Sequence, residues 1–306
     1  MKASGPGRVD WERVESELVP HLEPFASREI DKWTRGRPDA VSPMQRSSTE
    51  RIYEILPADV LPFLHPPMDE WPFPRGTRKS DWMVPEIENM TGGLPLAMGF
   101  HNYVEQFGRI PTWSQARQWF SDSSQSSIFH DPAWEKYRAN RSNIPEERWE
   151  RGICWRIGNA YLSFIREMDF LSRMVHVHGI PLRMHILADA VLKVDFWCGP
   201  HAVCVFIPND MKRRKKTPVA GINGVVHEVM IGDGTAWVEE NGLRRRLAWN
   251  EIKQAPEAEL AKLASAIRAD RTGVRGSPQQ RSRPPSIPGF RIPGKNVATR
   301  LMQSVS

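Results

Sequence analysis

Residues Trp149 to His178, WERGICWRIGNAYLSFIREMDFLSRMVHVH, carry the strongest structural signal in the chain. Apolar side chains recur there at steps of three and four residues, which is the spacing of one face of a helix. They are Ile157, Tyr161, Phe164, Ile165, Met168 and Leu171. The triplet Gly179-Ile180-Pro181 predicts the end of this helix. We therefore expect one long helix with a continuous apolar stripe.

Downstream of this helix the pattern changes to strands. Ala190 to Trp197 and Ala202 to Ile207 are apolar runs joined by CGPH, which predicts a tight hairpin. A second hairpin is expected from VVHEVMI, Gly232-Asp233-Gly234 and TAWVEE. Asn250 to Ile267 predict a closing helix.

Upstream, residues 100–120, FHNYVEQFGRIPTWSQARQWF, predict two helices joined by a short turn. The first helix is expected from Leu94 to Phe107 and the second from Trp113 to Phe120, with Thr112 placed to cap the second. Gly108 begins the turn, because the chain must reverse within few residues there.

This segment resembles the helix-turn-helix of several bacterial DNA-binding proteins. The resemblance implies that the second helix enters the major groove. Four polar side chains would then face bases or phosphates: Ser114, Gln115, Arg117 and Gln118. The alternative is an ordinary helical hairpin, in which Trp113, Ala116, Trp119 and Phe120 fill a core.

The order of long helix, strand and hairpin strand is similar to the core of the PD-(D/E)xK superfamily, the restriction-endonuclease-like fold. That resemblance implies a helical Glu at Glu167 and a strand Asp at Asp195, which together would bind Mg²⁺ for metal-assisted cleavage. The family's ExK position holds Val205, Phe206 and Ile207, so Asp210 and Lys212 are the candidates to replace it. The catalytic candidates are Glu167, Asp195, Asp210 and Lys212.

Asp195 and Glu167 each have a structural interpretation as an alternative to the catalytic one. Asp195 would be a half-buried residue paired with Arg183 or Lys193, and Glu167 would be a solvated partner on an arginine-rich helix.

The positive charge of the chain is concentrated in two places. The net charge is +6, and the stretch from Arg271 to Ser306 holds seven cations and no carboxylate, which leaves the remainder near −1. The second place is a loop of five consecutive cations: Lys212, Arg213, Arg214, Lys215 and Lys216. Such runs favour contacts with phosphates, although a solvated loop is the alternative for the second.

Three cysteines without CxxC spacing, and an N-terminus without an apolar stretch, predict a cytoplasmic protein with no membrane segment. We expect an α+β fold with a mostly helical region at 1–148, a nuclease-like α/β domain at 149–268 and a disordered basic tail at 269–306. The expected partner is nucleic acid, in particular DNA, with protein partners as an addition. The expected function is that of a divalent-metal endonuclease, a transposase-type endonuclease subunit, or an inactive relative. The alternative is a non-enzymatic DNA-binding accessory or regulatory protein of a mobile genetic element.

Overall fold

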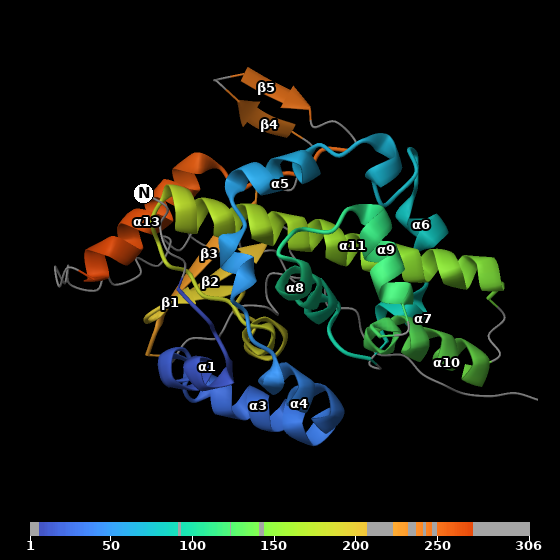
Figure 1. Cartoon of the computed structure of the whole chain (residues 1–306), viewed down its shortest axis with the longest axis horizontal. Helices are drawn as coiled ribbons and strands as arrows, with labels where there is room; N and C mark the ends of the chain where they lie inside the picture. The colour runs from blue at the N-terminus through green and yellow to red at the C-terminus, as the bar shows by residue number, and fades with distance from the viewer. Residues whose placement is uncertain are drawn as a thin grey trace, which may run out of the picture. The chain divides into compact units, whose positions relative to one another are not determined.

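A computed structural model describes residues 6–90, 93–122, 124–140, 144–206, 223–231, 237–240, 243–246 and 250–271. The fold is mixed α+β and mostly helical, with one three-stranded and one two-stranded sheet among the described residues. This confirms the predicted α+β class in its general form, and Figure 1 shows the arrangement.

Short helices form most of the first half of the chain. The α-helices before the turn region are α1 (Trp11–Glu17), α2 (Val19–Leu22), α3 (Phe25–Gly36), α4 (Pro38–Arg46), α5 (Pro57–Leu64), α6 (Lys79–Trp82) and α7 (Pro85–Glu88). Single turns of 3-10 helix lie at η1 (Arg51–Glu54), η2 (Met68–Glu70) and η3 (Ser126–Ile128). Prolines begin α4, α5 and α7, at the first helical position where the missing N–H is not needed. Pro43 and Pro62 lie inside α4 and α5, where each removes one helical hydrogen bond.

The predicted long helix is confirmed as α11 (Glu146–Ser172), which continues into the π-helical turn η4 (Arg173–Val177). All six apolar residues of its predicted stripe are buried. Glu146 and Glu147 occupy the first turn, where carboxylates interact favourably with the helix dipole.

The main sheet has the order β1 (Phe196–Cys198), β2 (His201–Phe206) and β3 (Val225–Met230). The predicted first hairpin is confirmed, because β1 and β2 pair antiparallel around Gly199, which has a φ of 57°. Its first strand is shorter than expected, since Ala188–Leu192 form a π-helical turn, η5. A buried apolar run has the same appearance in a strand and in a buried helix, so periodicity alone could not separate them.

The predicted second hairpin is wrong. β3 pairs parallel with β2, in the register Val203 opposite His227, and the expected return strand β4 (Trp237–Glu240) pairs instead with β5 (Leu243–Arg246). The Gly-Asp-Gly sequence predicted a tight turn back onto β3. The strand that pairs with β3 is instead β2, and the sequence near β3 contains no signal for this pairing.

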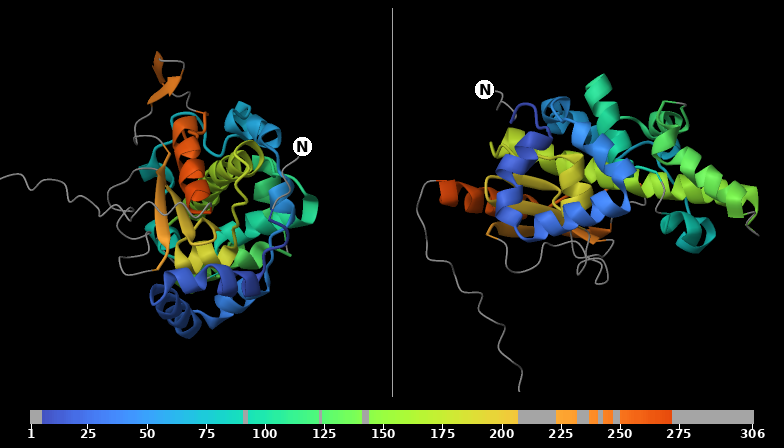
Figure 2. Two further views of the ribbon diagram at one scale, coloured as in Figure 1. Left: turned by 90° about the vertical axis from the view of Figure 1, so that its left-hand side faces the viewer. Right: turned by 90° about the horizontal axis from the view of Figure 1, so that it is seen from below.

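Helices cover both faces of the main sheet. α11 lies on one side, where Phe170 stacks on Phe196 with 5.2 Å between ring centroids. The helices α1, α3 and α4 lie on the other side (Figures 1 and 2). The closing helix is α13 (Glu257–Arg271), seven residues shorter at its start than the predicted range, and it lies beside the C-terminal end of α11.

Contacts between distant parts of the sequence hold the first helices to the segment around Met184, whose neighbour Arg183 forms an isolated bridge with Trp197 of β1. The hydroxyl of Tyr53 accepts the N–H of Met184 at 3.0 Å and donates to the Met184 carbonyl at 3.2 Å. Thr49 donates to the same carbonyl at 2.8 Å, and all these groups are buried. Glu17 and Arg183 form an ion pair of 2.9 Å close to them. The described residues up to 268 form one compact unit, and its core continues past residue 148, where the sequence predicted a domain boundary.

Candidate nucleic-acid interface

The predicted pair of helices joined by a turn is present, as α8 (Leu96–Phe107) and α9 (Trp113–Ser121). Gly108 ends α8 in the left-handed region, with φ of 66°, and its N–H donates to the Val104 carbonyl at 2.7 Å. A Cβ at this position would lie 3.6 Å or more from its neighbours, so the backbone conformation and not the lack of space favours glycine. Thr112 caps α9 as predicted, because its Oγ1 accepts the N–H of Gln115 at 3.3 Å.

The inward side of α9 belongs to the core. Phe120 packs edge-on against Phe100 at 4.9 Å between ring centroids, and the ring of Trp113 lies 5.6 Å from that of Tyr161 on α11. Trp119 is half-buried, and its Nε1 donates to a backbone carbonyl of α8 at 2.8 Å. Both tryptophans are therefore directed toward the fold, and the outward side of α9 consists of smaller polar side chains.

Glu70 occupies the N-terminal end of α9. Its carboxylate accepts the backbone N–H of Ser114 at 3.0 Å and the Ser114 hydroxyl at 2.5 Å. Partial burial alone would raise the pKa of Glu70, but the hydrogen bonds from Ser114 hold that pKa below its ordinary value. An anionic group already neutralises this helix end, so a phosphate would have to contact α9 further along its length.

Gln115 supports the cap of α9. Its Oε1 accepts the backbone N–H of Thr112 at 3.0 Å and the hydroxyl of Tyr103 at 3.2 Å, and the residue is half-buried. Arg117 and Gln118 are exposed, and their side chains make no hydrogen bond or ion pair with any residue that the structure describes. Of the four polar residues that the resemblance assigned to recognition, these two are thus available to a partner.

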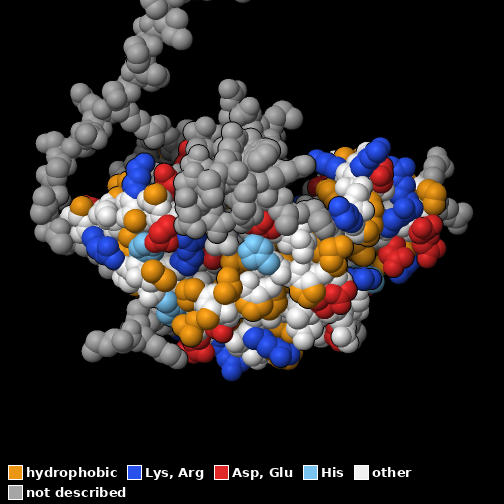
Figure 3. All heavy atoms as spheres, turned by 90° about the horizontal axis from the view of Figure 1, so that it is seen from above, with side chains coloured by type: hydrophobic (Ala, Val, Ile, Leu, Met, Phe, Trp, Pro, Cys, Tyr) orange, Lys and Arg blue, Asp and Glu red, His pale blue; other side chains and the backbone are white. Residues whose placement is uncertain are grey.

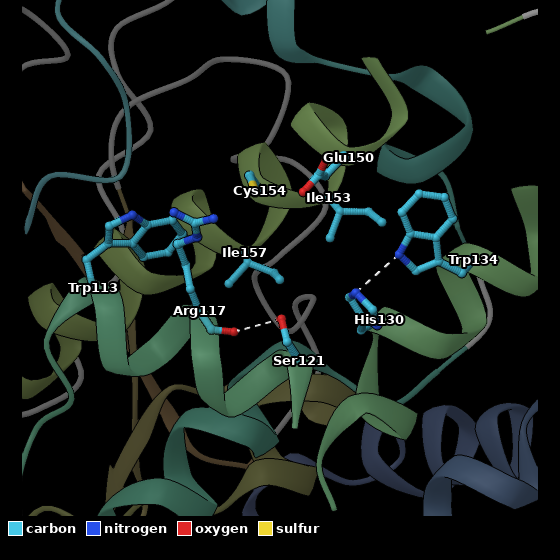
Figure 4. A pocket seen from close by; sticks show the side chains of 9 residues that line it. All are labelled: Trp113, Arg117, Ser121, His130, Trp134, Glu150, Ile153, Cys154 and Ile157. Atoms are coloured by element: carbon cyan, nitrogen blue, oxygen red, sulfur yellow. Dashed lines mark hydrogen bonds between the residues drawn. The ribbon is translucent and has the colours of Figure 1, made fainter. Parts of the chain in front are cut away.

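A pocket lies between α9, α10 (His130–Asn140) and α11 (Figure 4). Figure 4 shows Trp113 and Trp134 on opposite sides of it, with the side chains of Glu150 and Cys154 coming from α11. Its aromatic and titratable lining consists of Trp113, Arg117, His130, Trp134, Glu150 and Cys154. Trp134 Nε1 donates to His130 Nε2 at 3.1 Å, so the His130 proton is on Nδ1. The pocket therefore combines flat apolar walls with a few polar groups, as ligand sites do.

The two charges of this pocket are not paired with each other. Neither Arg117 nor Glu150 forms an ion pair or a side-chain hydrogen bond within the described parts of the chain. Both act on Cys154: burial raises the pKa of its thiol, the nearby Arg117 lowers it, and Glu150 raises it. The net shift of this pKa is upward, so the thiol is protonated at neutral pH and is not an activated nucleophile.

Other exposed cations come from the segment that leads into α6. Arg75, Arg78 and Lys79 are exposed, and α6 packs against α11. Figure 3 shows Lys and Arg side chains gathered at the end of the molecule that carries α6 and the first turns of α11, with carboxylates among them. This face is mixed in charge and not uniformly basic.

The prediction that Asp195 lies on a strand is wrong. Asp195 lies in the bend that precedes β1. It is 5% exposed, and its Oδ2 accepts the backbone N–H of Val205 in β2 at 2.6 Å. Val194 and Phe196 are buried as well, so Asp195 and both of its neighbours in the sequence lie in the core. The π-helical turn η5 ends at Lys193 with φ of 61°, and this turn redirects the chain before Asp195.

Glu167 is half-buried on α11, one turn before Phe170. Its neighbour Arg166 is largely buried, and burial lowers the pKa of that guanidinium to about 10, although Glu167 acts in the opposite direction. No group of three or more His, Cys, Asp or Glu side chains in the described ranges has a metal-binding arrangement. The predicted Glu167 and Asp195 pair thus has no third ligand among those residues.

The remaining predicted site residues lie outside the described residues. They are Asp210, Lys212, Arg213, Arg214, Lys215 and Lys216. The proposed replacement of the ExK motif and the basic loop therefore stay predictions, as does the basic segment after residue 271.

The pocket has no counterpart among the predicted sites, because it needs α10, which has few apolar residues and was not predicted as a separate helix. The signal was the four-residue spacing of His130 and Trp134, and of Glu150 and Cys154, which places each pair on one helix face.

Comparisons with known proteins give no relative: no protein-family model, no curated protein and no solved structure matches the chain. Among the described helices, none has the length and apolar character needed to cross a membrane.

Proposed function

We propose that the protein is DNA-associated and contacts DNA through the outward side of α9, with Arg117 and Gln118 as the principal contacts. The observation that carries the proposal is the pair of exposed side chains without partners among the described residues, on a helix fixed by the Gly108 turn and the Thr112 cap. Arginine and glutamine are suited to base edges and phosphates. Glu70 at the N-terminal end of α9 directs such contacts to the middle of the helix.

Between the two forms of this function, we favour the non-enzymatic one. Asp195 is the principal metal ligand in the nuclease interpretation, and its carboxylate is buried and engaged by the Val205 N–H. A carboxylate in this position stabilises the β1–β2 hairpin, because it satisfies a buried backbone N–H. This structural role explains an aspartate at position 195 without metal chemistry. The protein is then a DNA-binding accessory or regulatory protein.

The test is binding of the full-length protein to fluorescent duplex DNA, followed by anisotropy at several salt concentrations. Arg117→Ala is expected to weaken binding and to make the slope of log affinity against log salt shallower by about 0.9. Gln118→Ala is expected to weaken binding without changing that slope. Arg35→Ala, an exposed arginine on α3, is the matched control and should change neither. Unchanged binding in both α9 variants would show that α8 and α9 are a structural hairpin only.

A further inference from the structure

We propose that the pocket between α9, α10 and α11 binds an unpaired guanine base, with Arg117 and Glu150 contacting different groups on its edges. This inference rests on the proposed association with nucleic acid and deepens it, since it names the base that a pocket beside the proposed contact surface of α9 would select. Figure 4 shows the residues concerned.

The walls of the pocket suit a flat aromatic ligand. Trp113 and Trp134 come from different helices and lie on opposite sides of the pocket, and Ile153 and Ile157 of α11 add apolar surface. Trp113 is held by its contact with Tyr161, and Trp134 is held through its hydrogen bond to His130. Trp134 is half-buried and, fixed in this way, needs little reordering when a base stacks on it. Trp113 is 5% exposed, so it closes the opposite side of the pocket rather than offering a free face.

The charges of the pocket select among the bases. Guanine carries two acceptors, O6 and N7, on one edge and two donor groups, N1–H and the exocyclic amine, on the next. A guanidinium donates to the acceptors, and a carboxylate accepts from the donors. Arg117 and Glu150 supply these two groups in one pocket, and neither is compensated by another described residue. Adenine has an unprotonated N1 at the corresponding place, which a carboxylate would repel.

The N1–H of guanine is occupied in a base pair, so the pocket requires an unpaired or extruded base. Arg117 belongs to the same exposed side of α9 as Gln118, so a base in the pocket would adjoin the proposed contact surface. A zwitterionic aromatic amino acid is the competing ligand, because its carboxylate and ammonium could also meet Arg117 and Glu150. We favour the base over the amino acid, because Arg117 lies on α9 next to Gln118, the other proposed DNA contact.

The experiment is calorimetric titration of the full-length protein with guanosine monophosphate, adenosine monophosphate, inorganic phosphate and phenylalanine. We expect guanosine monophosphate to bind at least about tenfold more tightly than adenosine monophosphate, the discrimination of one good bidentate contact. Glu150→Gln is expected to remove most of that discrimination. Glu147→Gln, which changes an exposed carboxylate one turn earlier on α11, should preserve it.

Equal affinity for the two nucleotides, phosphate binding as tight as that of the nucleotide, or binding of phenylalanine in place of the nucleotide would each overturn the inference. Duplex binding by wild type and Glu150→Gln is measured in parallel. If duplex DNA binds and guanosine monophosphate does not, the guanine pocket is wrong and the proposed function stands. If the nucleotide binds and duplex DNA does not, the duplex-binding proposal is the one that fails.

Discussion

At the scale of single residues, Asp195 shows how a carboxylate can resemble a catalytic group and serve the backbone. Its predicted position on the apolar strand that follows a long helix resembled that of a metal ligand. In the structure its Oδ2 accepts the Val205 N–H and thereby joins the bend before β1 to the C-terminal end of β2. The pairing of β1 with β2 begins only at Phe196 and Val203, so the Asp195 side chain supplies a hydrogen bond to β2 beyond the end of that pairing.

Asp195→Ala is therefore expected to lower stability. Loss of the acceptor leaves the buried N–H of Val205 without this bond, which costs about 1–3 kcal/mol. Thermal melts of wild type and variant measure the loss. A cleavage assay with Mg²⁺ and Mn²⁺ accompanies them. A variant that melts like the wild type but loses metal-dependent cleavage would reinstate Asp195 as a metal ligand.

At the scale of elements, the turn between α8 and α9 depends on the conformation of one glycine. Gly108→Val is expected to destabilise the protein by about 1–2 kcal/mol, since a side chain in the left-handed region carries that cost. Gly108→Asn should cost clearly less, because asparagine tolerates this conformation better and the position has room for a Cβ. Chemical denaturation compares the three proteins. Equal loss in both variants would point to crowding by Arg51 instead of backbone conformation.

The elements that could be predicted are those with a local signal. α11 has its apolar stripe, α8 and α9 have a glycine and a cap, and the β1–β2 hairpin has a tight turn. The parallel pairing of β3 with β2 has no such signal, because it joins residues separated by the segment 207–222. The η5 turn is similar: three of its five residues are buried, and a short apolar run of this kind is compatible with a strand or a helix until its neighbours are known. The pocket was missed for the same reason, since three helices meet there.

At the scale of the whole molecule, the fold contains a histidine that is fully buried and acid-sensitive. Burial lowers the pKa of His101 to about 3, and the nearby His185 adds to this effect. Because the folded pKa lies below the ordinary value of 6.5, the unfolded chain takes up the proton first. The contribution of His101 to stability is complete above pH 6.5 and is lost as the pH falls toward 3.

The resulting loss approaches about 1.4 kcal/mol per pH unit in the middle of this range. We expect His101→Met, which keeps the volume and removes the titrating ring, to have a flatter dependence of unfolding free energy on pH between 6.5 and 4. His65→Gln, at an exposed position, should retain the wild-type dependence. Denaturation series at several pH values measure the slopes, and parallel slopes for His101→Met and wild type would exclude this role.

The basic C-terminal segment can be tested by deletion, although it lies outside the described residues. Residues 272–306 contain Arg275, Arg281, Arg283, Arg291, Lys295 and Arg300, without an acidic residue. If they contact phosphates, their removal should make the salt dependence of DNA affinity shallower by several units, at about 0.9 for each contact. The same anisotropy assay measures the slope. An unchanged slope would show that the segment does not contribute to binding.

The hydrogen bonds between Tyr53 and Met184 have a consequence for folding during synthesis on the ribosome. The two residues are 131 positions apart, so the hydroxyl has no partner backbone until the chain has grown that far. At about 5–20 residues per second this takes roughly 7–26 s. During that interval Val9, Val14 and Leu18, which are buried in the finished fold, have no sheet to cover them. The first helices therefore complete their core only after the segment that carries Met184 has been synthesised.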